Sequence, residues 1–88
     1  MENIFWKIVE DVSDEKAIDE YKALGIWNEI VGEKVASVTI PLKVSAGKII
    51  VKVKNSVWRN ELIMLKEPML KKYEEKLGKK VIKDIKFI

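Results

Sequence analysis

Apolar residues in the first third of the chain recur at the three- and four-residue steps of a helix. The positions that share this spacing, with carboxylates between them, are Ile18, Tyr21, Leu24, Trp27, Val31 and Val35. This period predicts a helix that runs to about Ala36. Gly25 and Gly32 lie inside it, and a glycine in a helix interior costs about 1 kcal/mol relative to alanine. We therefore expect one of them to mark a break or a kink.

The first fourteen residues predict a short helix and no export signal. Apolar side chains over residues 4–11 favour a helix, and Ser13 or Asp14 would cap the longer helix that follows. Residues 1–7 lack the basic stretch and apolar run of a signal peptide, and the longest aliphatic run spans only residues 62–65. We therefore expect a cytoplasmic protein without a membrane partner.

Past the first long helix, the period of the apolar positions changes to two, which is the period of a strand. The aliphatic residues of this segment are Val38, Ile40, Leu42 and Val44. Their alternation predicts a half-buried strand with its aliphatic side towards the core. Pro41 cannot donate to a strand ladder, so it should lie at a sheet edge or in a bulge. After a turn at Gly47, an antiparallel hairpin should form because the alternation resumes with Ile49, Val51 and Val53.

A third helix should begin at a cap provided by Asn55 or Ser56. Its apolar stripe is the longest in the chain and consists of Trp58, Leu62, Leu65, Met69, Tyr73 and Leu77. Pro68 lies inside this stripe, and its missing N–H predicts a kink or a restart with Pro68 at the first position of a new helical segment. Gly78 is a natural C-cap, and residues 81–88 predict a last strand.

The predicted elements follow the order α-α-β-β-α-β, which gives a single α+β domain over residues 1–88. Its three-stranded sheet should have the helices packed on one face. The connection from the second to the third strand contains a helix, so these two strands should be parallel. The strand order stays open. The inward face of the last strand also stays open, because Lys83 shares a side with Val81 and Ile85.

Composition excludes most catalytic chemistry. The 88 residues contain no cysteine and no histidine, which rules out thiol nucleophiles, imidazole bases and nearly all transition-metal sites. A chain of this length buries roughly 60 to 65% of its unfolded surface, which leaves little room for a large cleft. The sequence holds no phosphate loop or dinucleotide motif. We therefore expect a protein that is not an enzyme, holds no cofactor or metal and takes no small-molecule substrate.

The net charge of +3 is distributed unevenly along the chain. Residues 1–34 hold nine carboxylates and four lysines, a net charge of −5, whereas residues 35–88 hold thirteen basic residues and five carboxylates, a net charge of +8. Strand alternation places on one face Lys43, Lys48, Lys52 and Lys54. Such a stripe suits phosphate oxygens, although a solvated sheet face also carries lysines for solubility. Lysine and glutamate richness, with no glutamine, leans towards a thermophilic source.

Two further features that could bind nucleic acid have simpler structural explanations. A second basic cluster surrounds the end of the third helix and consists of Lys71, Lys72, Lys76, Lys79, Lys80, Lys83 and Lys86. Part of this cluster is capping, because the helix dipole favours cations near a helix C-terminus. Trp27 and Trp58 lie on the apolar stripes of their helices, which predicts a role in the core rather than base stacking.

One ordered set of residues extends over roughly residues 20–88. It consists of Trp27-Asn28-Glu29-Ile30-Val31-Gly32-Glu33-Lys34-Val35-Ala36, Thr39, Pro41, Gly47, Ser56-Val57-Trp58, Glu61-Leu62 and Leu77-Gly78. This set resembles the DciA family, which works with the bacterial replicative helicase. The resemblance implies a fold similar to a K-homology domain, DNA binding and contact with the DnaB-type helicase during its loading. The G-x-x-G clamp of K-homology domains is absent, so contacts to nucleic acid should come from the lysine faces.

The sequence thus predicts a DNA-binding accessory protein of the replicative helicase, acting at the nucleoid when replication begins. The expected phosphate contacts are Lys43, Lys48, Lys52, Lys54 and Arg59. The DNA partner is single- or double-stranded. Two alternatives stay open: an RNA-binding module on ribosomes or structured RNA, and a protein-interaction domain whose acidic half binds a basic partner while the lysines keep it soluble.

Overall fold

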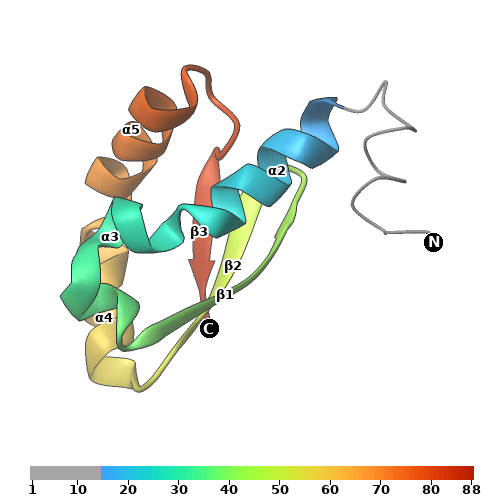
Figure 1. Ribbon diagram of the computed structural model, residues 1–88. Coiled ribbons are helices and arrows are strands. Elements are labelled where there is room, and N and C mark those ends of the chain that lie inside the picture. Colours follow the sequence, from blue (N-terminus) through green and yellow to red (C-terminus); the bar gives the residue numbers. More distant parts are fainter. Residues whose placement is uncertain (1–14) are drawn as a thin grey trace.

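A computed structural model describes residues 15–88 as four helices and three strands (Figure 1). In chain order they are α2 (Glu15–Gly25), α3 (Trp27–Ala36), β1 (Thr39–Ser45), β2 (Lys48–Val53), α4 (Ser56–Met64), α5 (Lys66–Leu77) and β3 (Asp84–Phe87). The predicted α+β class with a three-stranded sheet is confirmed. The predicted helix over residues 4–11 and the predicted cap at Ser13 or Asp14 lie outside the described residues.

The first long predicted helix is divided at both of its glycines. α2 ends at Gly25, and Ile26 leaves helical geometry with ψ of 8° before α3 begins. Gly32 then interrupts α3 with φ of 84° and ψ of 166°. A residue with a Cβ is strained at this φ, whereas the space around Gly32 is open. Glycine is therefore needed here for its backbone freedom and not for its small size.

The predicted third helix is also divided, into α4 and α5. Asn55 caps α4 as predicted, because its Oδ1 accepts a hydrogen bond from the Trp58 N–H at 3.0 Å. The sequence places Pro68 at the first position of the second segment, but α5 begins at Lys66 and holds Pro68 in its first turn. An N–H in the first turn has no helical acceptor, so proline is tolerated there. Gly78 ends α5 with φ of 75°, as predicted.

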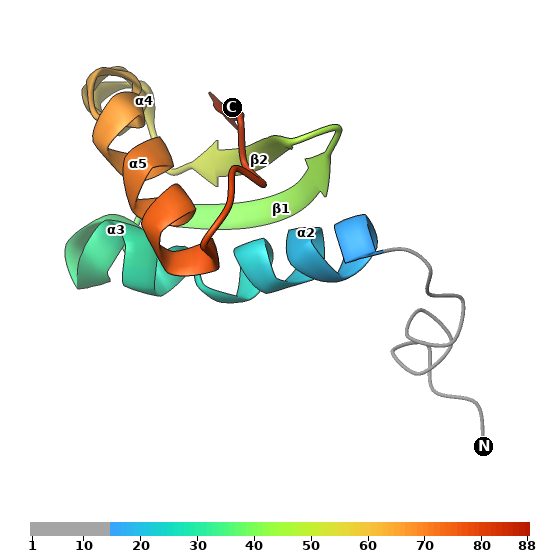
Figure 2. The same ribbon diagram turned by 90° about the horizontal axis from the view of Figure 1, so that it is seen from above.

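The sheet has the strand order β1-β2-β3, with β1 antiparallel and β3 parallel to β2. The parallel pair confirms the prediction made from the helical connection. Figure 2 shows α2 and α3 following one another along β1, with α5 beside α3 and α4 beside α5. Alternate residues of β2 and β3 are buried against the helices, namely Ile49, Val51, Val53, Ile85 and Phe87. Within residues 15–88, no helix covers the opposite face of the sheet.

Three aromatic rings form the centre of the core. The ring centroid of Trp27 lies 6.4 Å from that of Tyr73 and 6.5 Å from that of Phe87. The Tyr73 hydroxyl donates to the Ala23 carbonyl oxygen at 2.8 Å, and burial raises the pKa of Tyr73 above its ordinary value. Trp58 is half-buried and packs against the same cluster. The predicted core role of Trp27 and Trp58 is confirmed.

In the first half of β1, the residue that faces the core is not the one that the alternation predicts. Thr39 is only 7% exposed, whereas Ile40, which the alternation places in the core, is 58% exposed. The Thr39 hydroxyl accepts a hydrogen bond from Trp27 Nε1 at 2.9 Å and donates one to the Val35 carbonyl oxygen at 2.8 Å. Because both of its hydrogen-bonding roles are satisfied, this polar residue is buried at little cost.

A bulge in β1 reverses the alternation in the middle of the strand. Pro41 pairs with Val51 of β2, and Lys43 pairs with Ile50, the neighbour of Val51. Leu42 is therefore an extra residue in β1 with no partner in β2. Leu42 is 49% exposed, and its predicted inward position is wrong, whereas Val44 packs against the core as predicted. The prediction for Pro41 is confirmed, because β1 lies at the edge of the sheet and Pro41 borders the bulge.

β3 begins at Asp84, later than predicted, and its buried residues show which side of the strand faces the core. Lys83 precedes the strand, and Ile85 and Phe87 point to the core. The Gly47 carbonyl oxygen accepts hydrogen bonds from the N–H groups of Lys83 and Asp84 at 2.7 and 3.3 Å. Gly47 has φ of 79°, and a Cβ there would lie 3.2 Å from the Lys83 side chain. The hairpin turn therefore fixes where the last strand begins.

Candidate nucleic-acid interface

The helix-free side of the sheet carries lysines and aliphatic residues in alternation. Strand register, the bulge and the burial pattern assign to this side Ile40, Leu42, Lys43, Lys48, Ile50, Lys52, Asp84, Lys86 and Ile88. We call this surface the open sheet face. It combines positive charge with apolar area, the two properties that phosphates and bases respectively require.

One row across the three strands places an aliphatic residue between two cations. Ile50 pairs with Lys43 of β1 on one side and with Lys86 of β3 on the other. Neighbouring strands are about 4.8 Å apart, so the two lysine backbones are about 10 Å apart. Both lysines are exposed and Ile50 is half-buried.

The next row reverses the arrangement and places a cation between two aliphatic residues. Lys52 pairs with Ile40 in β1. On the other side, the Ile88 N–H donates to the Val51 carbonyl oxygen and the Val53 N–H donates to the Ile88 carbonyl oxygen, both at 2.8 Å. These two bonds place Ile88 beside Lys52. The two rows together form a chequered pattern of charge and apolar side chains.

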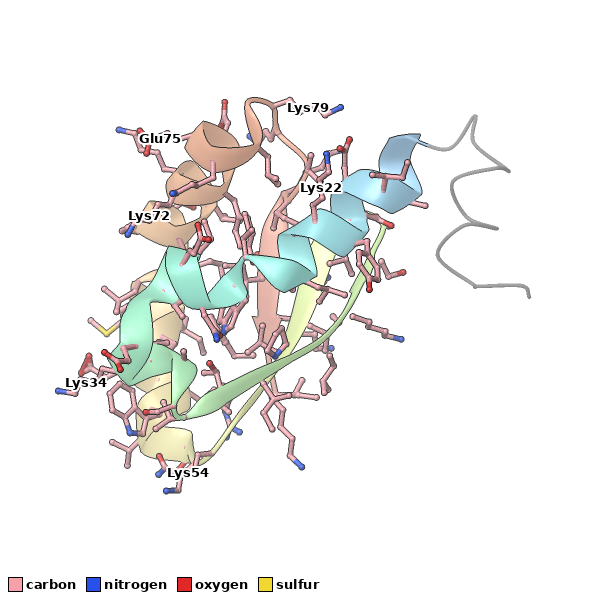
Figure 3. The ribbon with its side chains drawn as sticks, in the orientation of Figure 1. Lys22, Lys34, Lys54, Lys72, Glu75 and Lys79 are labelled. Carbon is pink, nitrogen blue, oxygen red and sulfur yellow. The ribbon has the colours of Figure 1, made fainter. Side chains whose placement is uncertain are left out.

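The structure groups three of the five predicted phosphate contacts on this face. Lys43, Lys48 and Lys52 belong to it by their register. Lys54 follows one alternation later, where its N–H donates to the Val38 carbonyl oxygen at 2.9 Å. Figure 3 shows Lys54 at the end of β2 beside α4. Arg59 is half-buried and lies on the helix α4, whereas the four predicted lysines belong to the β1–β2 hairpin and the residue that follows it.

Sequence reasoning missed other members of this face. The residues that it assigned to the core or to the second basic cluster are Ile40, Leu42 and Lys86. The misplacement of Ile40 and Leu42 follows from the bulge and from the buried threonine. Lys86 joins the hairpin lysines only through the parallel pairing of β3 with β2, which leaves no periodic signal in the sequence.

The second basic cluster is partly neutralised by the acidic N-terminal half. Lys79 Nζ lies 2.8 Å from Asp19 Oδ2, and Lys76 Nζ lies 3.4 Å from Glu29 Oε2. These pairs join α5 and the segment after it to α2 and α3. Figure 3 shows Lys79 at the end of the molecule opposite Lys54. Within residues 17–88, by contrast, no carboxylate lies within ion-pair distance of Lys43, Lys48, Lys52 or Lys54.

Asp84 is the one carboxylate of the open sheet face among the described residues. Partial burial opposes its ionisation, but the Ile85 N–H donates to its Oδ1 at 2.8 Å, and Lys66 Nζ lies 3.2 Å away. Together with the nearby charge of Lys48, these contacts outweigh burial and lower the pKa of Asp84. Asp84 is therefore ionised at neutral pH and competes with phosphates for Lys48.

An apolar groove of about 610 Å³ lies away from the open sheet face. It runs between α2 and the end of α5, and its lining includes Ile18, Tyr21, Ile26 and Leu77, with Glu29 and Lys76 at the rim. The lysines of its lining are Lys22 and Lys76, and Lys76 pairs with Glu29, so the groove offers a polyanion fewer cations than the open sheet face does. The described residues hold no group of three potential metal ligands and no helix long and apolar enough to cross a membrane.

Comparison of the sequence with protein-family profiles gives a match over most of the chain. The family profile described as "Dna[CI] antecedent, DciA" matches residues 5–87. The chain belongs to the DciA family. The comparison with curated proteins finds no match to the chain. DciA proteins are helicase loaders or accessory proteins and are not a known enzyme family. Membership implies a role related to helicase loading in bacterial replication, and association with the replicative helicase.

The residues that carry the DciA resemblance have structural roles in this chain. Trp27 fills the core, and Gly32 and Gly47 adopt positive φ. Pro41 borders the edge-strand bulge, and Trp58 packs against the core from α4. The family motif thus defines the fold, whereas the lysines of the open sheet face lie outside it.

Proposed function

We propose that this DciA protein binds DNA through the open sheet face and acts with the DnaB-type helicase while the helicase is loaded, at the nucleoid in the cytoplasm. The observation that carries the DNA-binding part is the group of lysines on the sheet face that no helix of residues 15–88 covers, where no ion pair with a carboxylate of residues 17–88 engages them. The proposed phosphate contacts on the face are Lys43, Lys48 and Lys52. Lys54 and Arg59 extend this positive surface towards α4.

The charges support a polyanion as the ligand. On the open sheet face, four lysines accompany a single carboxylate, Asp84. Lysine ammonium groups bind phosphate oxygens without reading base sequence. This role therefore suits a loader that must act on DNA of any local sequence.

Charge reversal tests the DNA-binding part of the proposal. Lys52→Glu with Lys54→Glu should lower affinity for a labelled oligonucleotide more than about tenfold, because two phosphate contacts become repulsive. The matched control is Lys71→Glu with Lys72→Glu, which makes the same charge change on exposed positions of α5. Fluorescence anisotropy measures both variants at one salt concentration. Equal affinities of the two variants would overturn the assignment of the open sheet face.

The helicase part is tested with purified components. The protein, treated with nuclease, is mixed with the replicative helicase of the same organism and analysed by size-exclusion chromatography. Co-elution supports direct contact, and the absence of co-elution contradicts it. Capture of ribosomal proteins that is lost with nuclease would instead favour an RNA-binding module. A folded protein that binds no nucleic acid at low salt would favour a protein-interaction domain.

A further inference from the structure

Exposed aliphatic side chains on the open sheet face need a ligand that lysines alone do not explain. Ile40 is 58% exposed, Leu42 49% and Ile88 44%. Each interrupts the lysine pattern, and a face that served only phosphates or solubility would carry polar residues at these positions. The arrangement indicates a ligand with apolar surfaces spaced between negative charges.

A nucleic-acid strand with unpaired bases has this alternation. Its phosphates are charged, and the flat face of each base is apolar and sequence-independent. On the open sheet face, Lys52 lies between Ile40 and Ile88, and Ile50 lies between Lys43 and Lys86. In these two rows, a cation and an aliphatic side chain are one strand spacing apart, about 4.8 Å, and along β2 the same alternation recurs every two residues, about 7 Å.

Duplex DNA fits the same face less well. In a duplex the base faces are stacked inside, so only groove edges and phosphates reach a protein surface. The major groove is about 12 Å wide and admits a helix or a two-stranded ribbon, whereas three strands span about 14 Å. A duplex on this face would lie across its lysines and leave the exposed isoleucines against phosphates or water.

We propose that the open sheet face binds single-stranded DNA, with bases on Ile40, Leu42 and Ile88 and phosphates on the flanking lysines. This inference rests on the DNA binding proposed above and names the strand form that the same face selects. The aliphatic platform gives apolar contact without aromatic stacking, so it favours no base over another.

The test compares single-stranded and duplex oligonucleotides of equal length at one salt concentration. The double variant Ile40→Ser with Ile88→Ser keeps every lysine and should lower affinity for the single strand about tenfold while leaving duplex affinity unchanged. The control is Met64→Ser, which removes an apolar side chain that is 79% exposed at the end of α4, away from the sheet. Thermal melting of each variant checks that all three proteins are folded.

Each outcome separates this inference from the proposed function. Selective loss of single-strand binding in the serine double variant supports both. Equal binding of single strand and duplex, unaffected by the serines, overturns the single-strand inference and leaves DNA binding in place. Binding of neither form by the wild-type protein overturns both. Unchanged DNA binding with loss of helicase co-elution would make the isoleucines a protein contact and would also overturn the inference.

Discussion

The lysines of the open sheet face and those near the end of α5 carry the same charge in different surroundings. Lys76 and Lys79 each face a carboxylate of the acidic N-terminal half, Glu29 and Asp19, at 3.4 and 2.8 Å. Lys52, by contrast, lies between two isoleucines, and none of the carboxylates in residues 17–88 is within ion-pair distance of it. The acidic half of the sequence therefore neutralises part of one basic region and leaves the lysines of the other without ion pairs to it among the described residues.

This difference shows that the count of lysines in a region does not measure its capacity to bind a polyanion. A phosphate that approaches Lys79 must displace Asp19, whereas a phosphate at Lys52 displaces only water and counterions. The net charge of the C-terminal half overstates the positive surface near α5 for this reason.

Salt should reveal the face that binds. With four or five lysine contacts, the logarithm of the duplex association constant should fall with the logarithm of salt concentration at a slope of about −4. Between 50 and 200 mM salt, this slope lowers affinity by about two orders of magnitude. Lys52→Glu with Lys54→Glu should make the slope shallower by about 2, which anisotropy titrations at several salt concentrations measure. A slope that stays the same would mean that other cations hold the DNA.

Reversal of the paired lysines should affect folding and not DNA. Lys76→Glu with Lys79→Glu places like charges beside Glu29 and Asp19 and should lower the free energy of unfolding by about 1 kcal/mol, a value that partial exposure of the pairs keeps small. DNA affinity should change by less than about threefold. Urea unfolding and anisotropy measure the two quantities. A loss of DNA affinity as large as that caused by Lys52→Glu with Lys54→Glu would contradict the view that only the lysines of the sheet region bind DNA.

Acid should weaken the fold through Asp84. Its pKa is lowered in the folded protein from the ordinary 3.8, so the stabilisation that it provides is present above that value and is lost as the pH falls through the lower, folded pKa. Asp84→Asn should cost a few tenths of a kcal/mol at pH 7, a small value because Lys66 and Asp84 are both partly exposed, and less at pH 2. Urea unfolding at the two pH values measures the difference, and an equal effect at both would refute the prediction.

The same Asp84→Asn variant should bind DNA slightly more tightly than the wild type. It removes the one carboxylate of the open sheet face within residues 15–88 and frees Lys48 from its neighbour across the strands. We expect about a twofold gain in affinity at low salt, and none at high salt because the interaction is screened. Anisotropy at two salt concentrations measures both, and weaker binding at low salt would show that Asp84 positions Lys48 for the phosphate.

The predictions that succeeded from sequence depend on local rules. Asn55 caps a helix and Gly78 ends one because each acts on backbone groups within four residues of itself. The alternation of β2 placed Ile49 inward and Lys52 outward correctly because no bulge or long-range polar contact interrupts that strand. The periodic signal was sufficient for these elements.

The failures depend on contacts between distant parts of the chain. Thr39 is buried because Trp27, twelve residues away, supplies a donor for its hydroxyl. Lys86 joins the hairpin lysines because of a parallel pairing with β2 that no local pattern encodes. The ion pairs that distinguish the two basic regions join segments distant in sequence, such as α2 with the segment after α5 through Asp19 and Lys79. The binding face could therefore be predicted in part, and its composition only from the fold.

The bulge at the outer edge of β1 has a consequence for self-association. A straight edge strand offers a regular ladder of N–H and C=O groups to a neighbouring copy, and such edges seed aggregates. In β1, Pro41 has no N–H to offer, and the bulge at Leu42 breaks the spacing of the groups beside it. The edge of β1 therefore offers a neighbouring copy no regular ladder for strand pairing, which would keep copies apart if they bound close together on one DNA strand as proposed above.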